Sequence, residues 1–402
     1  MCNEVLKKAI NSVLNSKMSF CKFLTANDTG ATGGHQVGIL ISKSASDMMF
    51  TKTELCSGSI VKKTVKINWQ DSMQTESCFT YYQSKNELRI TRFGRGFPFL
   101  VPEETGSLFV FTKLEDDYFN GYFLETEDEI DSFLDTFNIS PTETNRLITS
   151  KGILQSEREK EVIYDFIRGL TVDFPPSEEM STAAREIENT LYNHKEHIIS
   201  NPDNKIISWT NMEFELFRSL EHVRYGSIIS NGFNSVDEFV EMANTVLNRR
   251  KSRAGKSLEH HLSAIFDGNQ IRYTSQAVTE GKKKPDFIFP SEDAYHDLDF
   301  PVNKLVSLAA KTTCKDRWRQ VINEADRLRN GNKYLCTLQQ GISETQINEM
   351  EREKVILVVP KPYISSYPRS KQSKIWTLSQ FVNFVKEKVN LKFIDHIDKT
   401  FK

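Results

Sequence analysis

The stretch Lys284-Pro285-Asp286-Phe287-Ile288-Phe289 decides the fold of the second half of the chain. It places a carboxylate where the chain enters a short apolar strand, and the next predicted strand, 305–312, carries Lys311 near its end among small residues. A lysine that leaves a half-buried strand loses side-chain freedom and hydration, which indicates a function for its charge. If the two strands are antiparallel neighbours, Asp286 and Lys311 lie side by side.

A second carboxylate, Glu324, follows on a helix predicted over 316–329, with a buried stripe of Trp318, Val321, Ile322 and Ala325. A helix packed on the sheet brings Glu324 to the same end. Two carboxylates and a lysine fit Mg²⁺-dependent phosphodiester hydrolysis, because Mg²⁺ prefers hard carboxylate oxygens and a lysine stabilises the phosphate charge. Asp286 and Lys311 alone also fit a turn aspartate and a surface lysine.

Three charged residues stand together shortly after Lys311. Lys315 and Arg317 can donate to guanine O6 and N7 in the major groove, and Asp316 can accept from cytosine N4. The cluster therefore predicts recognition of G·C pairs beside the catalytic residues. The alternative is that Asp316 caps a helix whose lysine and arginine are solvated.

Helices alternate with strands in the rest of this half. The sequence Ser235-Val236-Asp237-Glu238 predicts a capping box, followed by an apolar stripe that begins at Phe239 and continues through Ala243, Val246 and Leu247. A second helix carries Leu258, Leu262, Ile265 and Phe266, and further strands are expected at 334–338 and 355–359. We expect an α/β sheet between helices.

The first half reads mainly as strands and loops. Strands are predicted at 36–41, 60–67, 88–93 and 108–111, with helices at 127–137 and 155–170, and a barrel-like β domain accounts for them. The Pro175-Pro176 pair bars a continuing helix and predicts a linker at 173–180. We therefore expect an N-terminal domain over 1–172 and a C-terminal domain over 181–402, in an α+β or α/β multidomain chain.

Length and composition agree with two domains but hide a charge asymmetry. The chain has 402 residues and a formal net charge of −2. The segment 115–135 holds nine acidic residues and no Lys or Arg, whereas 249–284 holds nine basic and three acidic residues. Near-neutrality is thus a cancellation and does not exclude a DNA partner. We expect Lys251, Arg253 and Lys256 to contact DNA phosphates, and a solvated face is the alternative for either run.

Cysteines and apolar runs limit the class of protein. The six cysteines form no CxxC pair, so we expect free thiols and no structural zinc site. No apolar run is long enough to span a membrane, and the N-terminus lacks the order of a signal peptide. A cytoplasmic protein without a membrane partner is expected.

Five segments together carry a family pattern: 25–38, 89–96, 248–259, Lys283-Lys284-Pro285-Asp286-Phe287 and 311–324. They resemble the EcoRII-type restriction endonucleases. The resemblance implies a bacterial or archaeal type II enzyme, a homodimer that makes Mg²⁺-dependent double-strand cuts at 5′-CCWGG-like sites with a C-terminal PD-(D/E)xK endonuclease domain. It also implies an N-terminal β-barrel-like domain that binds a second copy of the site and autoinhibits cleavage. A cognate DNA methyltransferase is expected in the same restriction-modification system, though not as a physical partner.

The resemblance also implies residue roles. The catalytic set is Asp286, Lys311 and Glu324, with Glu259 as a further acidic member, and Asp286 and Glu324 bind the metal. Lys315, Asp316 and Arg317 read the outer base pairs, and the effector DNA is bound by Lys22, His35, Lys85, Glu87 and Arg89. The sequence departs from the wider nuclease pattern at Ala309, where an acidic residue is usual, and from the effector-binding pattern at Leu40 and Leu88.

Three further hypotheses remain open from the sequence. One is a DNA-binding regulator, which would bind DNA but not hydrolyse it. A repair or recombination nuclease would select DNA structure, which fits the base-reading cluster less well. The acidic 115–135 segment is a candidate for inhibiting the basic catalytic cleft, with a solvated acidic face as the alternative.

Overall fold

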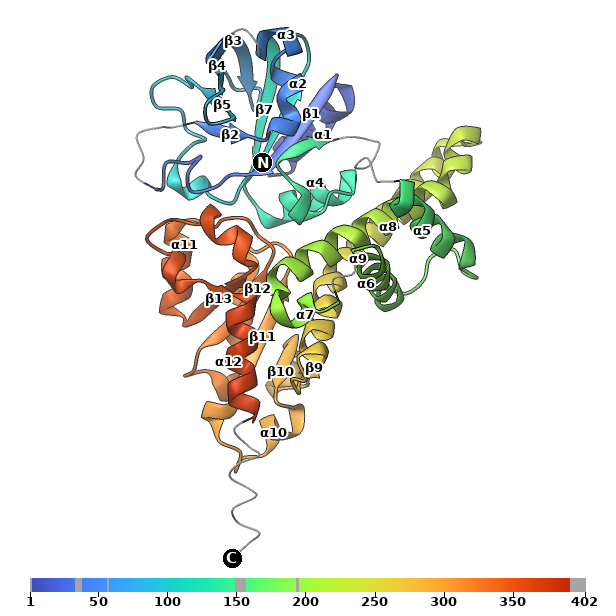
Figure 1. Cartoon of the computed structure of the whole chain (residues 1–402), viewed down its shortest axis with the longest axis vertical. Coiled ribbons are helices and arrows are strands. Elements are labelled where there is room, and N and C mark those ends of the chain that lie inside the picture. Colours follow the sequence, from blue (N-terminus) through green and yellow to red (C-terminus); the bar gives the residue numbers. More distant parts are fainter. Residues whose placement is uncertain (1, 33–37, 56–57, 149–156, 193–194, 391–402) are drawn as a thin grey trace, which may run out of the picture. The chain divides into compact units, whose positions relative to one another are not determined.

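The computed structural model describes residues 2–32, 38–55, 58–148, 157–192 and 195–390 (Figure 1). The chain forms two compact units. One comprises Met1–Ile153 with Gln339–Asn348 and Ser365–Gln372, and the other comprises Leu154–Leu338, Glu349–Ile364 and Ser373–Lys402. The sequence-based division into 1–172, 173–180 and 181–402 stays a prediction.

The first unit is built on an eight-stranded sheet in the order β2-β5-β4-β3-β7-β6-β1-β8. Every pairing is antiparallel except β3 with β7. The strands are β1 (Met18–Phe23), β2 (Ile39–Ile41), β3 (Ile60–Trp69), β4 (Met73–Tyr82), β5 (Glu87–Thr91), β6 (Leu108–Lys113), β7 (Tyr118–Leu124) and β8 (Arg146–Ile148). The strands predicted near 60–67, 88–93 and 108–111 are confirmed; residues 36–37 lie outside the described ranges.

This sheet curls until its two ends meet. The Lys22 ammonium on β1 donates to the Leu40 carbonyl oxygen on β2 at 2.7 Å, although β2 is the first strand in the order and β1 the last but one. The Ser42 N–H, just after β2, donates to the Asn145 side chain just before β8 at 3.1 Å. The barrel-like form expected from the sequence is thereby confirmed.

Aromatic side chains fill the inside of the curl. Alternation along β3 buries Val61, Val65, Ile67 and Trp69 on one face. The Trp69 ring packs directly over Gly121, where a Cβ atom would collide with the ring. The alternation of buried and exposed residues along β3 is the two-residue period that the sequence predicted for this strand.

Helices cover the other face of the curl. The helix α1 (Cys2–Asn15) and α4 (Glu127–Phe137) share a core with β6 and β7; α2 (Ser46–Met49) and α3 (Lys52–Leu55) are short. The helix α4 confirms the prediction at 127–137. Its Thr126 and Glu129 form a capping box, so part of the acidic 115–135 segment stabilises a helix end.

The second unit holds a six-stranded sheet in the order β14-β13-β12-β11-β10-β9. The strands β9, β10 and β11 are antiparallel, and β11 to β14 run parallel. They are β9 (Thr274–Ser275), β10 (Phe287–Phe289), β11 (Val306–Lys311), β12 (Lys333–Thr337), β13 (Val355–Val359) and β14 (Trp376–Thr377). All four strands predicted in this half are confirmed.

Both faces of this sheet are covered. On one face Phe266 of α9 (Val236–Gly268) packs against Phe287 and Phe289, and Phe289 packs against Phe381 of α12 (Leu378–Asn390). On the other, Ile288 joins a core with residues of α10 (Glu292–His296) and of the segment that carries Ala325. The helix α11 (Glu344–Arg352) precedes β13. The predicted α/β arrangement is confirmed.

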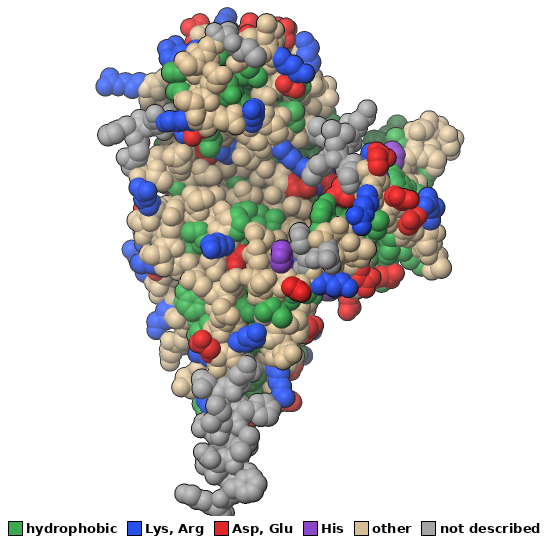
Figure 2. Space-filling model, viewed as in Figure 1, with side chains coloured by type: hydrophobic (Ala, Val, Ile, Leu, Met, Phe, Trp, Pro, Cys, Tyr) green, Lys and Arg blue, Asp and Glu red, His purple; other side chains and the backbone are tan. Residues whose placement is uncertain are grey.

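A helical layer extends from this sheet. It contains α5 (Glu157–Gly169), α6 (Ser177–Tyr192), α7 (His197–Ser200) and α8 (Pro202–Asn231), and α5, α6 and α8 share one apolar core. Figure 2 shows several Asp and Glu side chains over α5 and α6, while Lys and Arg are scattered over the face in view. The four cysteines whose surroundings are described are buried free thiols. In the part of the chain that the structure describes, no helix is long and apolar enough to span a membrane.

Two sequence predictions on α9 were wrong. One helix of 33 residues replaces the two expected, because no proline lies between Leu247 and Leu258 and the helix continues through Gly255. The predicted apolar stripe is not buried, since Phe239 is 52% and Leu247 40% exposed. The Ser235 hydroxyl does accept from the Glu238 N–H, but the Glu238 carboxylate accepts from the N–H of Asn234 and not of Ser235.

Candidate active site

Asp286 stands immediately before β10, where the antiparallel register with β11 sets its neighbours. Phe287 pairs with Leu308, so the next positions bring Asp286 beside the end of β11. The Ala310 N–H donates to Asp286 Oδ2 at 2.7 Å. Position 309, where the wider nuclease pattern has an acidic residue, is a buried alanine here.

Lys311 is the last residue of β11 and is half-buried. Its positive charge lowers the pKa of Asp286, Glu259 and Glu324 alike. Electrostatic coupling of this kind requires short separations. Lys311 follows Ala310, whose N–H holds Asp286, so Lys311 and Asp286 share this end of β11, and Glu259 and Glu324 lie within range of the Lys311 charge.

Glu324 does not lie on the α-helix that the sequence predicted. Two short 3₁₀ helices, η6 (Arg317–Asn323) and η7 (Asp326–Leu328), replace it, and Ala325 between them has φ −143° and ψ 89°. Side chains satisfy the backbone here, because the Thr279 hydroxyl donates to the Glu324 carbonyl oxygen at 2.6 Å. Within the predicted stripe, Trp318, Val321 and Ala325 are buried and Ile322 is half-buried.

Glu259 reaches the same group from α9. It is half-buried, and its Oε2 accepts from the side-chain amide of Gln276 at 2.9 Å. The same amide nitrogen donates to Asp286 Oδ1 at 3.0 Å. Gln276 was missed from the sequence, since it follows a strand of only two residues.

Each carboxyl group of this cluster has a pKa above its ordinary value. Burial first, and the Asp286 charge second, raise the pKa of Glu259 and of Glu324 to about 7. Burial also raises the pKa of Asp286, against the Ala310 N–H and Lys311, which lower it. The three carboxyls thus influence one another in a partly desolvated region, and pKa values perturbed in this way are frequent at functional sites.

The donor set suits a hard divalent cation. Asp286 and Glu324 supply carboxylate oxygens, and Mg²⁺ is typically held by one or two carboxylates with water and substrate phosphate. A cation would favour the ionised forms that burial disfavours. Among the described residues no group of three or more His, Cys, Asp or Glu is arranged to hold a metal ion, so the fit rests on the carboxylate pair.

Of the predicted base-reading residues, Lys315 and Asp316 lie between β11 and η6, and Arg317 is the first residue of η6. Lys315 is buried, Asp316 is exposed and Arg317 is half-buried. Asp316 occupies the N-cap position of η6, but its side chain makes no capping hydrogen bond. Helix capping, the alternative for Asp316, is therefore not what the structure shows.

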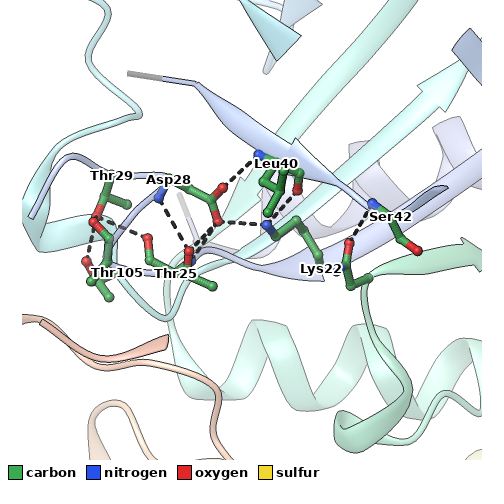
Figure 3. A network of polar contacts seen from close by, with 9 residues as sticks. Lys22, Thr25, Asp28, Thr29, Leu40, Ser42 and Thr105 are labelled. Atoms are coloured by element: carbon green, nitrogen blue, oxygen red, sulfur yellow. Dashed lines mark hydrogen bonds and ion pairs between the residues drawn. The ribbon is translucent and has the colours of Figure 1, made fainter. Parts of the chain in front are cut away.

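Lys22 is at the centre of a buried network in the first unit (Figure 3). Its ammonium donates to Asp28 Oδ2 at 2.7 Å and to the Leu40 carbonyl oxygen. Asp28 also accepts from the Thr25 N–H and the Leu40 N–H. This placement favours a role for Lys22 in holding the loop after β1 and leaves less scope for a direct DNA contact.

The other predicted effector residues cluster near β5. Lys85 is exposed in the turn before β5, and Arg89 donates to Glu87 Oε2 at 3.3 Å. Arg89 is only 8% exposed, and among the described residues its Nη1 has no hydrogen-bond acceptor. Leu88 is buried in the core of the curl. His35 lies outside the described residues.

The basic stretch on α9 serves packing as well as charge. Arg249 lies over the Phe174 ring at 3.9 Å, and Arg250 pairs with Glu221 at 2.8 Å. Arg253 is buried over the Phe214 ring at 3.9 Å, so the expectation of a phosphate contact from Arg253 was wrong. Lys251 and Lys256 are exposed.

Comparisons with known proteins agree across both halves. The family model "EcoRII C terminal" matches residues 217–382, and "Restriction endonuclease EcoRII, N-terminal" matches 13–139. The chain is 36% identical over 389 residues to the type II restriction enzyme EcoRII of Escherichia coli, which covers 90% of this chain and 92% of that protein. It is 31% identical over 120 residues to the type II restriction enzyme SsoII of Shigella sonnei, covering 27% and 37% of the two chains.

Among solved structures, the restriction endonuclease PspGI in complex with substrate DNA matches with a TM-score of 0.45 and 20% identity, over 54% of this chain and 94% of that one. The identity with the Escherichia coli enzyme extends over nearly the whole of both proteins, and the C-terminal family model spans α9, β10 and β11, which carry most of the acidic cluster. The chain therefore belongs to the EcoRII family of type II restriction enzymes and is a site-specific DNA endonuclease.

Proposed function

We propose that the cluster of Asp286, Lys311, Glu324 and Glu259 is the catalytic site for Mg²⁺-dependent double-strand cleavage of DNA at 5′-CCWGG-like sequences. The observation that carries this proposal is the convergence of three carboxyls with raised pKa values and one lysine at the junction of β10, β11 and α9. Asp286 and Glu324 would hold the cation.

The chain's own groups supply orientation and charge. The Ala310 N–H fixes one oxygen of Asp286, so this carboxylate keeps a single orientation. The Lys311 ammonium is positioned to donate to an attacking water or to the phosphate oxygens as negative charge develops. Bound Mg²⁺ would lower the pKa of a coordinated water and neutralise the phosphate.

Base recognition is assigned to Lys315, Asp316 and Arg317. They follow β11 after Thr312, Thr313 and Cys314, so the strand that carries Lys311 would also help to position them. Lys315 and Arg317 have the donors for guanine, and Asp316 has the acceptor for cytosine. One continuous segment of the chain would then carry both the catalytic lysine and the residues that recognise the bases.

The first unit is proposed to bind a second copy of the site and to regulate cleavage. Arg89 supports this role because its buried Nη1 has no hydrogen-bond acceptor among the described residues, while its Nη2 donates to Glu87. The N–H groups of Nη1 are the donors that we assign to the effector DNA. Lys85 is exposed in the adjoining turn, and His35 completes the proposed set. Lys22 would act by holding the backbone of β2 through Leu40.

A homodimer is proposed because the two strands of duplex DNA are antiparallel, and two catalytic sites related by a twofold axis match them. Apolar side chains are exposed on α8 and α9, including Ile229 at 65% and Val236 at 77%. Exposed apolar patches mark interaction sites, and we assign this one to a second copy. In sedimentation experiments the Phe239→Glu variant should be a monomer. The control variant Leu298→Glu, at another exposed site, should remain a dimer. A dimer for both variants would contradict the assignment of this surface to the dimer interface.

Cleavage of a plasmid that carries CCWGG sites tests the proposal. The purified chain with Mg²⁺ should produce double-strand cuts that map to these sites, and Asp286→Ala should produce none. Cuts by Asp286→Ala, or cuts that map elsewhere, would contradict the assignment. Binding without cutting by the wild-type chain would favour a DNA-binding regulator.

A further inference from the structure

We propose that Gln276 is a positioning residue for the catalytic carboxylates, and this inference rests on the proposed function of Asp286 and Glu259. The Gln276 amide nitrogen lies between them, 2.9 Å from Glu259 Oε2 and 3.0 Å from Asp286 Oδ1. Glu259 comes from α9 and Asp286 from the start of β10. One uncharged side chain therefore links the two elements at the site.

The backbone holds Gln276 opposite Asp286. The antiparallel pairing of Ser275 with Phe287 puts Gln276 next in register, and its N–H donates to the Asp286 carbonyl oxygen at 3.0 Å. Gln276 has φ +52°, in the left-handed region that non-glycine residues rarely adopt. Such conformations persist where the surroundings hold them and are frequent at functional sites.

A carboxamide suits this position for a chemical reason. Its nitrogen carries two N–H donors and no charge, so it can satisfy two carboxylate oxygens at once. The other oxygen of Asp286 already accepts from the Ala310 N–H at 2.7 Å. With Gln276 in place both oxygens of Asp286 are fixed, and Glu259 is held at a set distance from it.

Gln276 is exposed, so its side chain is not part of a packed core. Its replacement should alter the orientation of the two carboxylates and leave the sheet and α9 intact. Preorganised catalytic groups depend on such supporting hydrogen bonds, and small displacements of a catalytic group reduce the rate strongly.

Two substitutions separate the roles of shape and hydrogen bonding. Gln276→Met removes the donors without adding charge, whereas Gln276→Glu keeps the shape and adds a negative charge beside two carboxylates. The matched control is Gln270→Met, because Gln270 is also exposed and also left-handed at φ +58°. For each full-length variant we would measure the single-turnover rate on a CCWGG duplex in Mg²⁺, the Kd for that duplex in EDTA, and the Tm.

We expect Gln276→Met to reduce the rate by about tenfold or more, and Gln276→Glu to reduce it further, with Kd and Tm close to those of Gln270→Met. In a double-mutant cycle, Gln276→Met and Glu259→Gln should be non-additive in the rate. A Gln276→Met rate equal to that of Gln270→Met, a Gln276→Glu rate above that of Gln276→Met, or parallel losses in Kd and Tm would overturn the positioning role. Failure of the wild-type chain to cut would instead overturn the proposed function and this inference with it.

Discussion

The side chains of Glu259 and Glu324 are expected to make stability depend on pH. Their pKa values are raised to about 7, so the folded chain binds protons that the unfolded chain has already released near the ordinary value of 4.5. The folded state binds more protons in this interval, so the free energy of unfolding falls as pH rises from about 4.5 to about 7.

Glu324→Gln removes one such titration. We expect this variant to gain about 1 kcal/mol in unfolding free energy relative to wild type at pH 8, and to gain little near pH 4.5. Urea unfolding in EDTA at both pH values checks it. Glu241→Gln, at an exposed position on α9, is the control. An equal gain at both pH values would show that the raised pKa is not the cause.

Lys22 is expected to matter for stability. Lys22→Met leaves the Asp28 carboxylate buried beside fewer donors, and the loss of one partner of a buried ion pair costs about 3–5 kcal/mol. Urea unfolding of Lys22→Met measures this cost. Lys85→Met, at an exposed turn position, should cost much less. Similar values for the two variants would contradict the structural role of Lys22.

Single residues differ in how far the sequence predicted them. Asp286 and Lys311 were found because Asp286 comes just before one apolar run and Lys311 just after another. The antiparallel register then brings them together. Gln276 was not found because its role depends on a two-residue strand and on the reach of a side chain between two distant elements. Lys22 gave no signal of burial, since its partner Asp28 comes from a loop.

The segment that carries Glu324 shows why local pattern failed at the scale of an element. Its apolar spacing fits an α-helix, yet side chains from elsewhere satisfy its backbone: the Asp326 N–H donates to Glu280 Oε2 and the Arg327 N–H to the Tyr295 hydroxyl. These partners are remote in sequence. The strands that were predicted from the sequence were confirmed where the structure describes them, because their period depends only on which face is buried, but β1, β4, β7 and β8 were not predicted.

Thr279 is expected to fix this segment. Thr279→Val keeps the shape of the side chain but removes the donor to the Glu324 carbonyl oxygen. We expect the single-turnover cleavage rate to fall about tenfold as Glu324 shifts, while DNA affinity is maintained. Thr279→Ser keeps the hydroxyl and should stay close to wild type. If Thr279→Ser is as slow as Thr279→Val, the hydrogen bond is not the cause.

The net charge of −2 is a cancellation over the whole molecule, between an acidic first half and a basic second half with proposed separate tasks. If the first unit binds a second site copy and relieves inhibition, a plasmid with two CCWGG sites should be cut faster than one with a single site. A short CCWGG duplex added in trans should accelerate the one-site plasmid, and Arg89→Ala should abolish that acceleration. Equal rates on both plasmids would contradict regulation by a second copy.

The measurement that tests the catalytic assignment most directly is single-turnover cleavage by Asp286→Asn, taken together with its DNA affinity. This substitution keeps the size of the side chain and an oxygen that can accept from the Ala310 N–H, but it removes the charge. We predict cleavage in Mg²⁺ reduced by about a thousandfold or more, with the Kd for a CCWGG duplex in EDTA within about threefold of wild type. Cleavage at the wild-type rate by Asp286→Asn would contradict the account.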